Sequence, residues 1–301
     1  MADDILSAMT PARLVVMGDG LARAGDTANA TLLYRAALER GPDTELANRI
    51  RLRLGLAIKA DRRLKATYDI TEAVESIGTR NWFVGDGLAV WLKTQPFLED
   101  PRFMALSEQH DHLLPVRNWH WNLTVALWAV ARARALPGDL VELGVFKGHT
   151  TVFCADYVRF AEWDKRWWLY DTFEGIPEDQ LDPGWAKINA ELYGTNLYAE
   201  VRERFARFPN IDVIQGRVPE ILHERPPGQI AFLHVDMNNA SAEIAALDLL
   251  FDRVVPGGVI LFDDYAWGTS RAQYDAEKSW FERRGEMVLP LPTGQGLYVK
   301  R

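Results

Sequence analysis

Hydrophobic residues recur at helical spacing through roughly the first 135 residues of the chain. Leu14, Met17 and Leu21 share one face of a first helix, which ends before Gly25. A second helix is expected from about 27 to 40, followed by a glycine and a proline that stop it. The same spacing predicts further helices at about 44–60, 63–77, 85–94, 101–110 and 117–135.

The first two predicted helices, at 11–43, resemble a single tetratricopeptide repeat. The small, aromatic and proline positions of the repeat are held by Gly18, Ala30, Tyr34, Ala37 and Pro42. Such repeats need about three copies to be stable alone, so this pair is expected to pack against the helices that follow. The sequence therefore predicts an all-helical N-terminal region over residues 1–115.

The pattern changes at Pro137–Gly138, where short apolar strands begin to alternate with amphipathic helices. Helices are expected at 195–208 and 241–251, and a long polar stretch at 175–196 is expected to be a loop or lid. Strands are expected at 140–143, 166–170, 211–215, 230–235, 259–262, 287–289 and 296–299. This alternation predicts an α/β fold, a Rossmann-like doubly wound sheet of seven strands, over residues 116–301.

Composition and charge narrow the class of partner. The net charge of −8 argues against a general nucleic-acid binder and against an anionic membrane surface. Cys154 is the single cysteine, which excludes an internal disulfide, and its apolar neighbours favour burial. The N-terminus shows no signal peptide and no apolar run is long enough for a membrane span, so a cytoplasmic protein is expected. A homodimer is also possible, because the amphipathic N-terminal helices could form its interface.

Ligands of doubly wound sheets bind at the carboxyl ends of the strands, so the residues there carry the chemistry. The first strand contains Glu142, an acid in an apolar segment that needs a partner such as a ligand cation. Gly144 and Gly148 follow it and permit close approach of the backbone. Asp171 ends the second strand, where it suits the hydroxyls of a ribose, although a turn or helix cap is the alternative.

Three aspartates follow the next strands of the predicted sheet. Asp236 ends one strand, and Asp263 and Asp264 end a strand expected beside it. Like charges this close favour a bound cation, and oxygen ligands favour Mg²⁺ or Ca²⁺. The alternative is that one aspartate caps a helix while the others stay solvated.

Six segments together resemble the macrocin and mycinamicin sugar O-methyltransferases, a family of class I methyltransferases. They are VELGVFKGHT, LYDTFEGIP, NLYAEVRERF, FLHVDMN, VVPGGVILFDDY and LPTGQGL, in that order. The resemblance implies that S-adenosylmethionine is the cofactor, with Glu142 and Gly144 at its methionine end, Asp171 at the ribose, and Gly216 with Arg217 at the adenine. It implies that Asp236, Asp263 and Asp264 bind Mg²⁺, which binds the acceptor oxygens. The full set expected at the cofactor is Glu142, Gly144, Val145, Gly148, Thr150, Asp171, Thr172, Gly216, Arg217 and Asp236.

One departure from this family concerns the base. The family's second aspartate, two residues after the first metal ligand, is replaced by Asn238, and the lysine of catechol-type enzymes by Asn239. Neither amide accepts a proton at neutral pH. Three possibilities follow for the acceptor. It is a carboxylate, which is already ionised and needs no base, or a hydroxyl whose pKa the metal lowers. In the third case it is a hydroxyl from which a histidine removes the proton. His120 and Asp236 are the expected catalytic residues, since His234 is expected to face the other side of its strand.

The function predicted from these observations is Mg²⁺-assisted O-methylation of a small-molecule, natural-product or peptide acceptor. A dinucleotide-binding dehydrogenase is disfavoured, because G-x-G-x-x-G is absent after the first strand. The remaining alternative is a methyltransferase-fold scaffold that has lost catalysis and binds a partner through its N-terminal helices.

Overall fold

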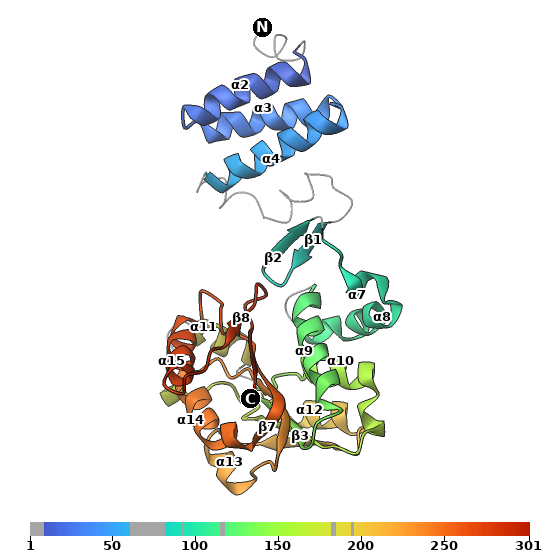
Figure 1. The fold of residues 1–301 in the computed structure, drawn as a ribbon, viewed down its shortest axis with the longest axis vertical. Helices are drawn as coiled ribbons and strands as arrows, with labels where there is room; N and C mark the ends of the chain where they lie inside the picture. Colours follow the sequence, from blue (N-terminus) through green and yellow to red (C-terminus); the bar gives the residue numbers. More distant parts are fainter. Residues whose placement is uncertain (1–8, 61–81, 92, 115–117, 182–184, 194–195) are drawn as a thin grey trace. The chain divides into compact units, whose positions relative to one another are not determined.

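The computed structural model describes residues 9–60, 82–91, 93–114, 118–181, 185–193 and 196–301 (Figure 1). Contacts divide them into two units, one reaching Val84 and including Ala89–Lys93, the other comprising Gly85–Leu88 and Thr94–Arg301. The boundary predicted from the sequence, between residues 115 and 116, lies later in the chain than this division. The predicted helix at 63–77 lies outside the described residues.

Among its described residues, the first unit contains three helices, α2 (Pro11–Arg23), α3 (Thr27–Glu39) and α4 (Thr44–Ala60). Gly18 allows α2 and α3 to pack closely, because a Cβ there would lie 2.6 Å from the ring of Tyr34. The predicted helices are confirmed to within a residue or so. Their kinship with tetratricopeptide repeats stays a prediction.

The predicted helix at 85–94 is wrong. The chain forms a hairpin of β1 (Trp82–Gly85) and β2 (Leu88–Trp91) instead. Its turn holds Asp86 and Gly87, both at positive φ (52° and 66°). Asp-Gly is a strong signal for a two-residue hairpin turn, because this turn needs positive φ at both central residues. That local signal outweighs the apolar spacing around it.

The second unit is built on a seven-stranded sheet with the order β5-β4-β3-β6-β7-β9-β8. The strands β3 to β7 are parallel, whereas β9 pairs antiparallel with β7 and β8. The chain turns back at β3, so β3 and β6 flank the switch point where doubly wound folds bind ligands. The strands are β3 (Asp139–Leu143), β4 (Trp167–Asp171), β5 (Ile211–Gln215), β6 (Ile230–Val235), β7 (Val254–Phe262), β8 (Leu289–Pro290) and β9 (Gly296–Val299).

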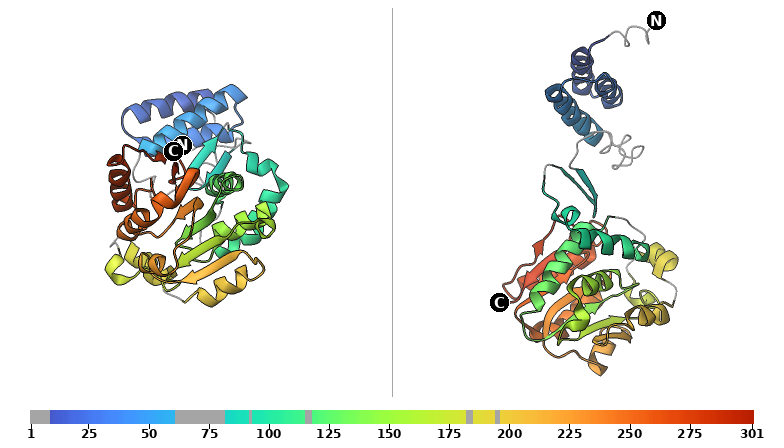
Figure 2. Two further views of the ribbon diagram at one scale, coloured as in Figure 1. Left: turned by 60° about the horizontal axis from the view of Figure 1, so that its bottom comes forward. Right: turned by 90° about the vertical axis from the view of Figure 1, so that its right-hand side faces the viewer.

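Helices cover both faces of this sheet (Figures 1 and 2). One layer contains α9 (His120–Ala133), which contacts β3, β6 and β7, and α10 (His149–Val158) beside it. The opposite layer contains α14 (Ala240–Leu250) and α15 (Arg271–Glu282), packed on one another. The remaining helices of this unit are α7 (Pro96–Glu99), α8 (Pro101–His110), α11 (Ala186–Ile188), α12 (Tyr198–Phe205) and α13 (Glu220–Glu224), with short turns at Asp111–Leu113, Phe160–Glu162, Glu178–Gln180, Asn189–Tyr193 and Phe251–Arg253.

The α/β class and the seven strands are confirmed, with shifts at element ends. The strand β7 begins at Val254, five positions before the predicted start at 259. The helix α12 is shorter than the predicted 195–208. Cys154 is buried within α10 as expected. Within the described residues, no helix combines the length and apolar character that a membrane span requires.

Candidate active site

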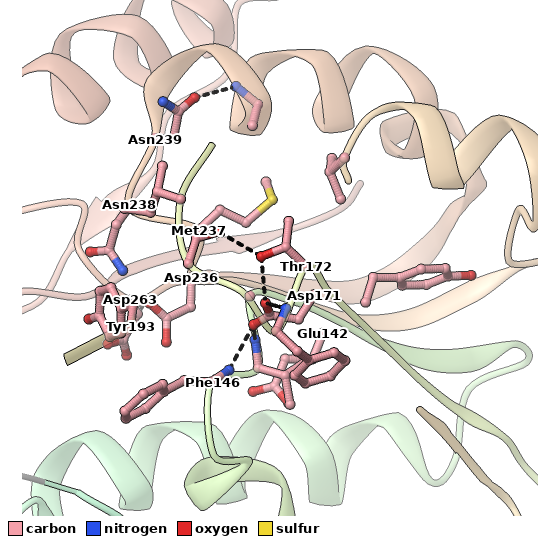
Figure 3. A pocket seen from close by; sticks show the side chains of 18 of the residues that line it. Glu142, Phe146, Asp171, Thr172, Tyr193, Asp236, Met237, Asn238, Asn239 and Asp263 are labelled. Atoms are coloured by element: carbon pink, nitrogen blue, oxygen red, sulfur yellow. Dashed lines mark hydrogen bonds between the residues drawn. The ribbon is translucent and has the colours of Figure 1, made fainter. Parts of the chain in front are cut away.

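A cavity of about 350 Å³ opens at the carboxyl ends of the parallel strands. It is lined from the ends of β3, β4, β6 and β7 and from the segments 175–180 and 185–193. Figure 3 shows these lining side chains converging from different strands. The sequence-predicted residues that line it are Glu142, Gly144, Val145, Thr150, Asp171, Thr172, Gly216, Asp236, Asp263 and Asp264. Those that lie elsewhere are Gly148, Arg217 and His120.

The glycines of the loop after β3 are required by packing within the protein. Gly144 has φ +83°, and a Cβ there would lie 1.9 Å from the carbonyl oxygen of Asp236. Gly148 has φ +73°, and its Cβ would lie 2.6 Å from the Phe205 ring. Only glycine fits such positions without a backbone shift. The loop is therefore held against the end of β6, which forms the floor of the cavity.

Asp171 organises two loops at the cavity. One carboxylate oxygen accepts hydrogen bonds from the backbone N–H groups of Val145 (2.6 Å) and Phe146 (2.8 Å). The other accepts one from Phe173 N–H (2.6 Å). These bonds tie the end of β4 to the loop after β3. A ribose contact by Asp171 stays a prediction. If Asp171 binds a ribose, it does so while its carboxylate also holds these two loops together.

Glu142 has its partner inside the protein. His234 Nδ1 lies 2.9 Å from Glu142 Oε1, and the Thr151 hydroxyl donates to the other carboxylate oxygen. The pair is possible because Glu142 and His234 are neighbours in the β3–β6 register. A ligand cation is therefore not needed to compensate this acid.

His234 does not face away from the acidic cluster, as alternation was expected to require. Its Nε2 lies 3.8 Å from Asp263 Oδ1. Residues two apart in a strand share a face, which places His234 and Asp236 on the same side. Burial by itself would lower the pKa of His234, but the carboxylates of Asp263 and Glu142 raise it to about 10. The ring is therefore an imidazolium at neutral pH.

Asp236, Asp263 and Asp264 all line the cavity. Burial, and then repulsion from Asp263 and Asp264, raises the pKa of Asp236 well above its usual range. Burial and Asp263 do the same for Asp264. Such mutual repulsion between carboxylates favours a divalent cation with oxygen ligands. Within the described ranges, however, no three carboxylate, imidazole or thiol groups are already arranged to hold a metal ion.

The two asparagines that replace the expected base have different roles. Asn239 caps α14, since its side-chain oxygen accepts hydrogen bonds from Ala242 N–H and the Ser241 hydroxyl, both at 2.8 Å. Asn238 lines the cavity in a left-handed conformation, with φ 55°. Its buried side-chain oxygen has no hydrogen-bond partner among the described residues. Asn238 is therefore placed to receive a hydrogen bond from a ligand, whereas Asn239 is committed to the fold.

The histidine at the cavity is not the one that the sequence favoured. His120 begins α9, and its ring stacks on Phe97 at a centroid distance of 5.2 Å. Burial lowers its pKa. His149, which no sequence argument singled out, lines the cavity at the first position of α10. The sequence feature that could have identified His149 as a cavity residue is its position directly after Gly148, at the start of a helix.

Arg217 is turned toward the surface. Its guanidinium pairs with Asp179 at 2.6 Å and lies 3.6 Å from Glu220. Gly216 does line the cavity, and a Cβ there would lie 2.6 Å from Ile221. The predicted adenine contact at this turn stays a prediction for Gly216, whereas the Arg217 side chain does not line the cavity.

The described parts of the predicted lid segment, residues 175–181 and 185–193, line part of the cavity. The Asn189 side chain accepts a hydrogen bond from Ile176 N–H (2.8 Å) and donates one to its carbonyl oxygen (3.2 Å). The Tyr193 ring meets the Phe146 ring edge-on at 5.0 Å. The apolar residues that this segment and its surroundings contribute are Leu114, Trp119, Ile176, Trp185, Ile188, Leu192 and Tyr193.

The tip of the hairpin supports the wall that contains Trp119. The Trp119 ring lies parallel to that of Trp267 at a centroid distance of 6.2 Å. Trp267 also lies against Gly87, where a Cβ would come within 2.4 Å of its ring. Asp86 caps the start of α9 by accepting hydrogen bonds from the N–H groups of Trp121 (2.8 Å) and Asn122 (3.1 Å).

We expect the wild-type protein to gain stability between pH 7.5 and 5.0 through protonation of Asp86, and an Asp86→Asn variant to lack this gain. Burial raises the pKa of Asp86 from 3.8 to about 6, so the folded protein binds the extra proton first and gains stability as pH falls. Between pH 7.5 and 5.0 this gain is about 1.4 kcal/mol in wild type and absent in the variant. Denaturant unfolding at both pH values measures it.

Asp100→Asn is the matched control, because Asp100 also caps a helix with its carboxylate. The Tyr157 hydroxyl lowers the pKa of Asp100, so this group stays ionised throughout the pH range used. Its replacement should shift stability equally at both pH values. Equal pH dependence in wild type and Asp86→Asn would contradict the prediction.

Known proteins resemble the part of the chain that contains this cavity. The model of the Macrocin-O-methyltransferase (TylF) family matches residues 120–281, which is more than half of the chain. The 8-demethyl-8-(2,3-dimethoxy-alpha-L-rhamnosyl)-tetracenomycin-C 4'-O-methyltransferase of Streptomyces olivaceus is 31% identical over 144 residues, which are 44% of this chain. The matched part spans about half of that relative, 55% of its length. Mycinamicin III 3''-O-methyltransferase of Micromonospora griseorubida is 26% identical over 55% of this chain and 69% of its own length.

Solved structures share the fold. The O-methyltransferase NovP matches with a TM-score of 0.52 and 22% identity over 60% of this chain and 79% of that protein. The calicheamicin methyltransferase CalS11 matches with a TM-score of 0.51 and 16% identity over 70% and 98%. The family match spans the cavity-lining ends of β3, β4, β6 and β7, so the chain belongs to the macrocin O-methyltransferase family.

Proposed function

We propose that this protein transfers a methyl group from S-adenosylmethionine to a hydroxyl oxygen of a small natural product. One observation carries the proposal. A single cavity at the switch point of a doubly wound sheet collects acidic and glycine residues from the ends of β3, β4, β6 and β7, within the family-matched segment. The relatives named above methylate oxygen atoms of natural products, as their names state.

A hydroxyl acceptor suits this cavity better than a carboxylate acceptor does. The lining residues that the structure describes include five carboxylates and no lysine or arginine. A carboxylate substrate would add a further negative charge to this acidic lining, whereas a hydroxyl acceptor adds none. Trp119, Trp185 and Leu192 offer apolar surface beside the acidic cluster, which suits an acceptor with a ring system next to its hydroxyl.

A divalent cation, most simply Mg²⁺, is part of the proposal. Its donors would be Asp236, Asp263 and Asp264, whose mutual repulsion and oxygen chemistry fit the ion. Bound there, it would lower the pKa of the acceptor hydroxyl. This assistance matters because neither Asn238 nor Asn239 can take the proton.

The first experiment is calorimetric titration of S-adenosylhomocysteine into the 301-residue protein. We expect saturable binding in wild type and at least tenfold weaker binding in Asp171→Ala, because this variant releases the three backbone N–H groups that shape the loop. Asp212→Ala is the matched control, since Asp212 on β5 pairs with Arg166 outside the cavity lining. It should bind with wild-type affinity.

Methyl transfer is then assayed with hydroxylated glycosides and free carboxylates as acceptors, with Mg²⁺ or with EDTA. Transfer to hydroxyl acceptors that EDTA abolishes would support the complete proposal. Transfer insensitive to EDTA would remove the cation from it. Absence of any S-adenosylhomocysteine binding in wild type would overturn the enzyme function and favour the scaffold alternative.

A further inference from the structure

The carboxylate of Asp263 is held in place by neighbouring side chains, unlike those of the two aspartates beside it. Gln295 Nε2 donates a hydrogen bond to Asp263 Oδ1 at 3.2 Å, and His234 Nε2 lies 3.8 Å from the same oxygen. Burial and neighbouring charges raise the pKa values of Asp236 and Asp264, and among the described residues neither side chain accepts a hydrogen bond. Asp263 is therefore the fixed member of the acidic cluster.

The sheet places these two groups on either side of Asp263. Asp263 directly follows β7, which lies between β6 and β9. Phe262 faces Gly296 in the antiparallel pairing of β7 with β9, so the next residues outward are Asp263 and Gln295. His234 belongs to β6. Because both groups face Oδ1, the other oxygen, Oδ2, is the one left for a ligand in the cavity that Asp263 lines.

Gln295 is itself fixed in orientation by Thr293. Gln295 is 1% exposed, and its side-chain oxygen accepts a hydrogen bond from the Thr293 hydroxyl at 3.1 Å. An amide whose oxygen is already engaged presents its NH₂ group to the carboxylate. Neither residue lines the cavity, and both lie after the family-matched residues 120–281. They can therefore affect a ligand only through Asp263.

The turn between β8 and β9 is packed closely enough to hold Gln295 in this position. Gly294 has φ +93°, and a Cβ there would lie 2.3 Å from Trp267 Nε1. The carbonyl oxygen of Gly294 accepts a hydrogen bond from Ala266 N–H at 2.7 Å. This bond joins the turn to the loop that follows β7, which also contains Asp263.

A neutral donor suits a carboxylate that is to bind a cation. An ammonium or guanidinium group at position 295 would compensate the charge of Asp263 and compete with the ion. An amide N–H orients the carboxylate and leaves its charge in place. The positive charge of His234 is opposed on its other side by Glu142, whose Oε1 lies 2.9 Å from Nδ1.

We propose that Gln295, oriented by Thr293, is a positioning residue that makes Asp263 the fixed first donor of a divalent-cation site. This inference rests on the proposed function and on the cation within it. Within the described ranges, no three suitable groups are already arranged around an ion. One donor that is fixed in advance lowers the ordering cost of bringing Asp236 and Asp264 to the same ion.

Calorimetric titration of Mg²⁺ into the 301-residue protein, saturated with S-adenosylhomocysteine, tests this role. Gln295→Met keeps the length of the side chain and removes the donor. We expect it to bind Mg²⁺ about tenfold more weakly than wild type, because hydrogen-bond partners of metal ligands tune metal affinity. Its affinity for S-adenosylhomocysteine should stay within about twofold of wild type, since Gln295 does not line the cavity.

Gln273→Met is the matched control. Gln273 is also a buried glutamine, 4% exposed, and it donates to a carboxylate outside the cation site, Glu243 Oε1, at 3.1 Å. It does not line the cavity. The variant should lose a comparable hydrogen bond and still bind Mg²⁺ with wild-type affinity.

Thr293→Val tests whether the effect passes through Gln295. The donor remains but the hydroxyl that orients it is removed, so we expect about threefold weaker Mg²⁺ binding. When Thr293→Val is added to Gln295→Met, it should cause no further loss, because Thr293 acts only through Gln295. Thermal unfolding of each variant establishes that it is folded.

The positioning role is overturned if folded Gln295→Met binds Mg²⁺ as tightly as wild type, or if Gln273→Met loses as much affinity. Additive losses from Thr293→Val and Gln295→Met would also overturn it. If wild type binds S-adenosylhomocysteine but not Mg²⁺, the cation and this inference fail while the cofactor assignment stands. If wild type binds neither, the proposed function itself fails.

Discussion

A His234→Leu variant should lose about 3–5 kcal/mol of stability, because removing one partner of a buried ion pair leaves the other charge uncompensated. His234 is 1% exposed, bonds Glu142 through Nδ1 and lies 3.8 Å from Asp263 through Nε2. Leucine is apolar and of similar size, so the effect is chiefly electrostatic. Urea unfolding of the ligand-free protein at pH 7.5, followed by circular dichroism, measures it.

A double variant separates this charge effect from loss of packing. When Glu142→Gln is added to His234→Leu, the buried carboxylate left by the single variant disappears. The double variant should therefore be more stable than His234→Leu alone, since removing both members of a buried pair costs less than removing one. Additive losses from the two substitutions would contradict the charge compensation that we assign to His234.

Gly144→Ala should destabilise the protein by about 3 kcal/mol and abolish binding of S-adenosylhomocysteine. A Cβ at Gly144 would lie 1.9 Å from the Asp236 carbonyl oxygen, and its φ of +83° is already unfavourable for alanine. The neighbouring backbone must move, and with it the N–H groups of Val145 and Phe146 that Asp171 binds. Denaturant unfolding and calorimetry with S-adenosylhomocysteine provide the two measurements.

Gly228→Ala is the matched control for this variant. Its position has nothing within 4 Å of a Cβ and no positive φ, so alanine should be tolerated. Its stability should lie within about 0.5 kcal/mol of wild type, with unchanged binding. If Gly144→Ala behaves like Gly228→Ala, the close approach of the β3 loop to β6 is not what requires glycine at position 144.

Most of the second unit could be predicted from local patterns. Apolar runs such as Ile230–Val235 are buried along their whole length, as strands of a parallel sheet are. Each strand ends where its apolar run ends. The positions of Asp171, Asp236 and Asp263 at the carboxyl edge of the sheet could therefore be predicted from the ends of these runs. The hairpin at Asp86 and Gly87 shows the limit of periodicity, since one Asp-Gly turn signal decided that segment.

The partners of the site residues could not be predicted in the same way. Glu142 and His234 are far apart in the sequence and meet only through the pairing of β3 with β6. His120 and His149 look equally suitable as isolated histidines. Only packing places the first on Phe97 and the second at the cavity.

The fold class, the family resemblance and the residue types at the carboxyl edge of the sheet can all be inferred from the sequence without a structure. These depend on local periodicity and on chain order, which a linear sequence contains. The sequence does not show which charges compensate one another, why Gly144 must be glycine, or which histidine lines the cavity. Such features depend on distances between separate strands and helices, and these arise only when the whole sheet and its covering helices are packed.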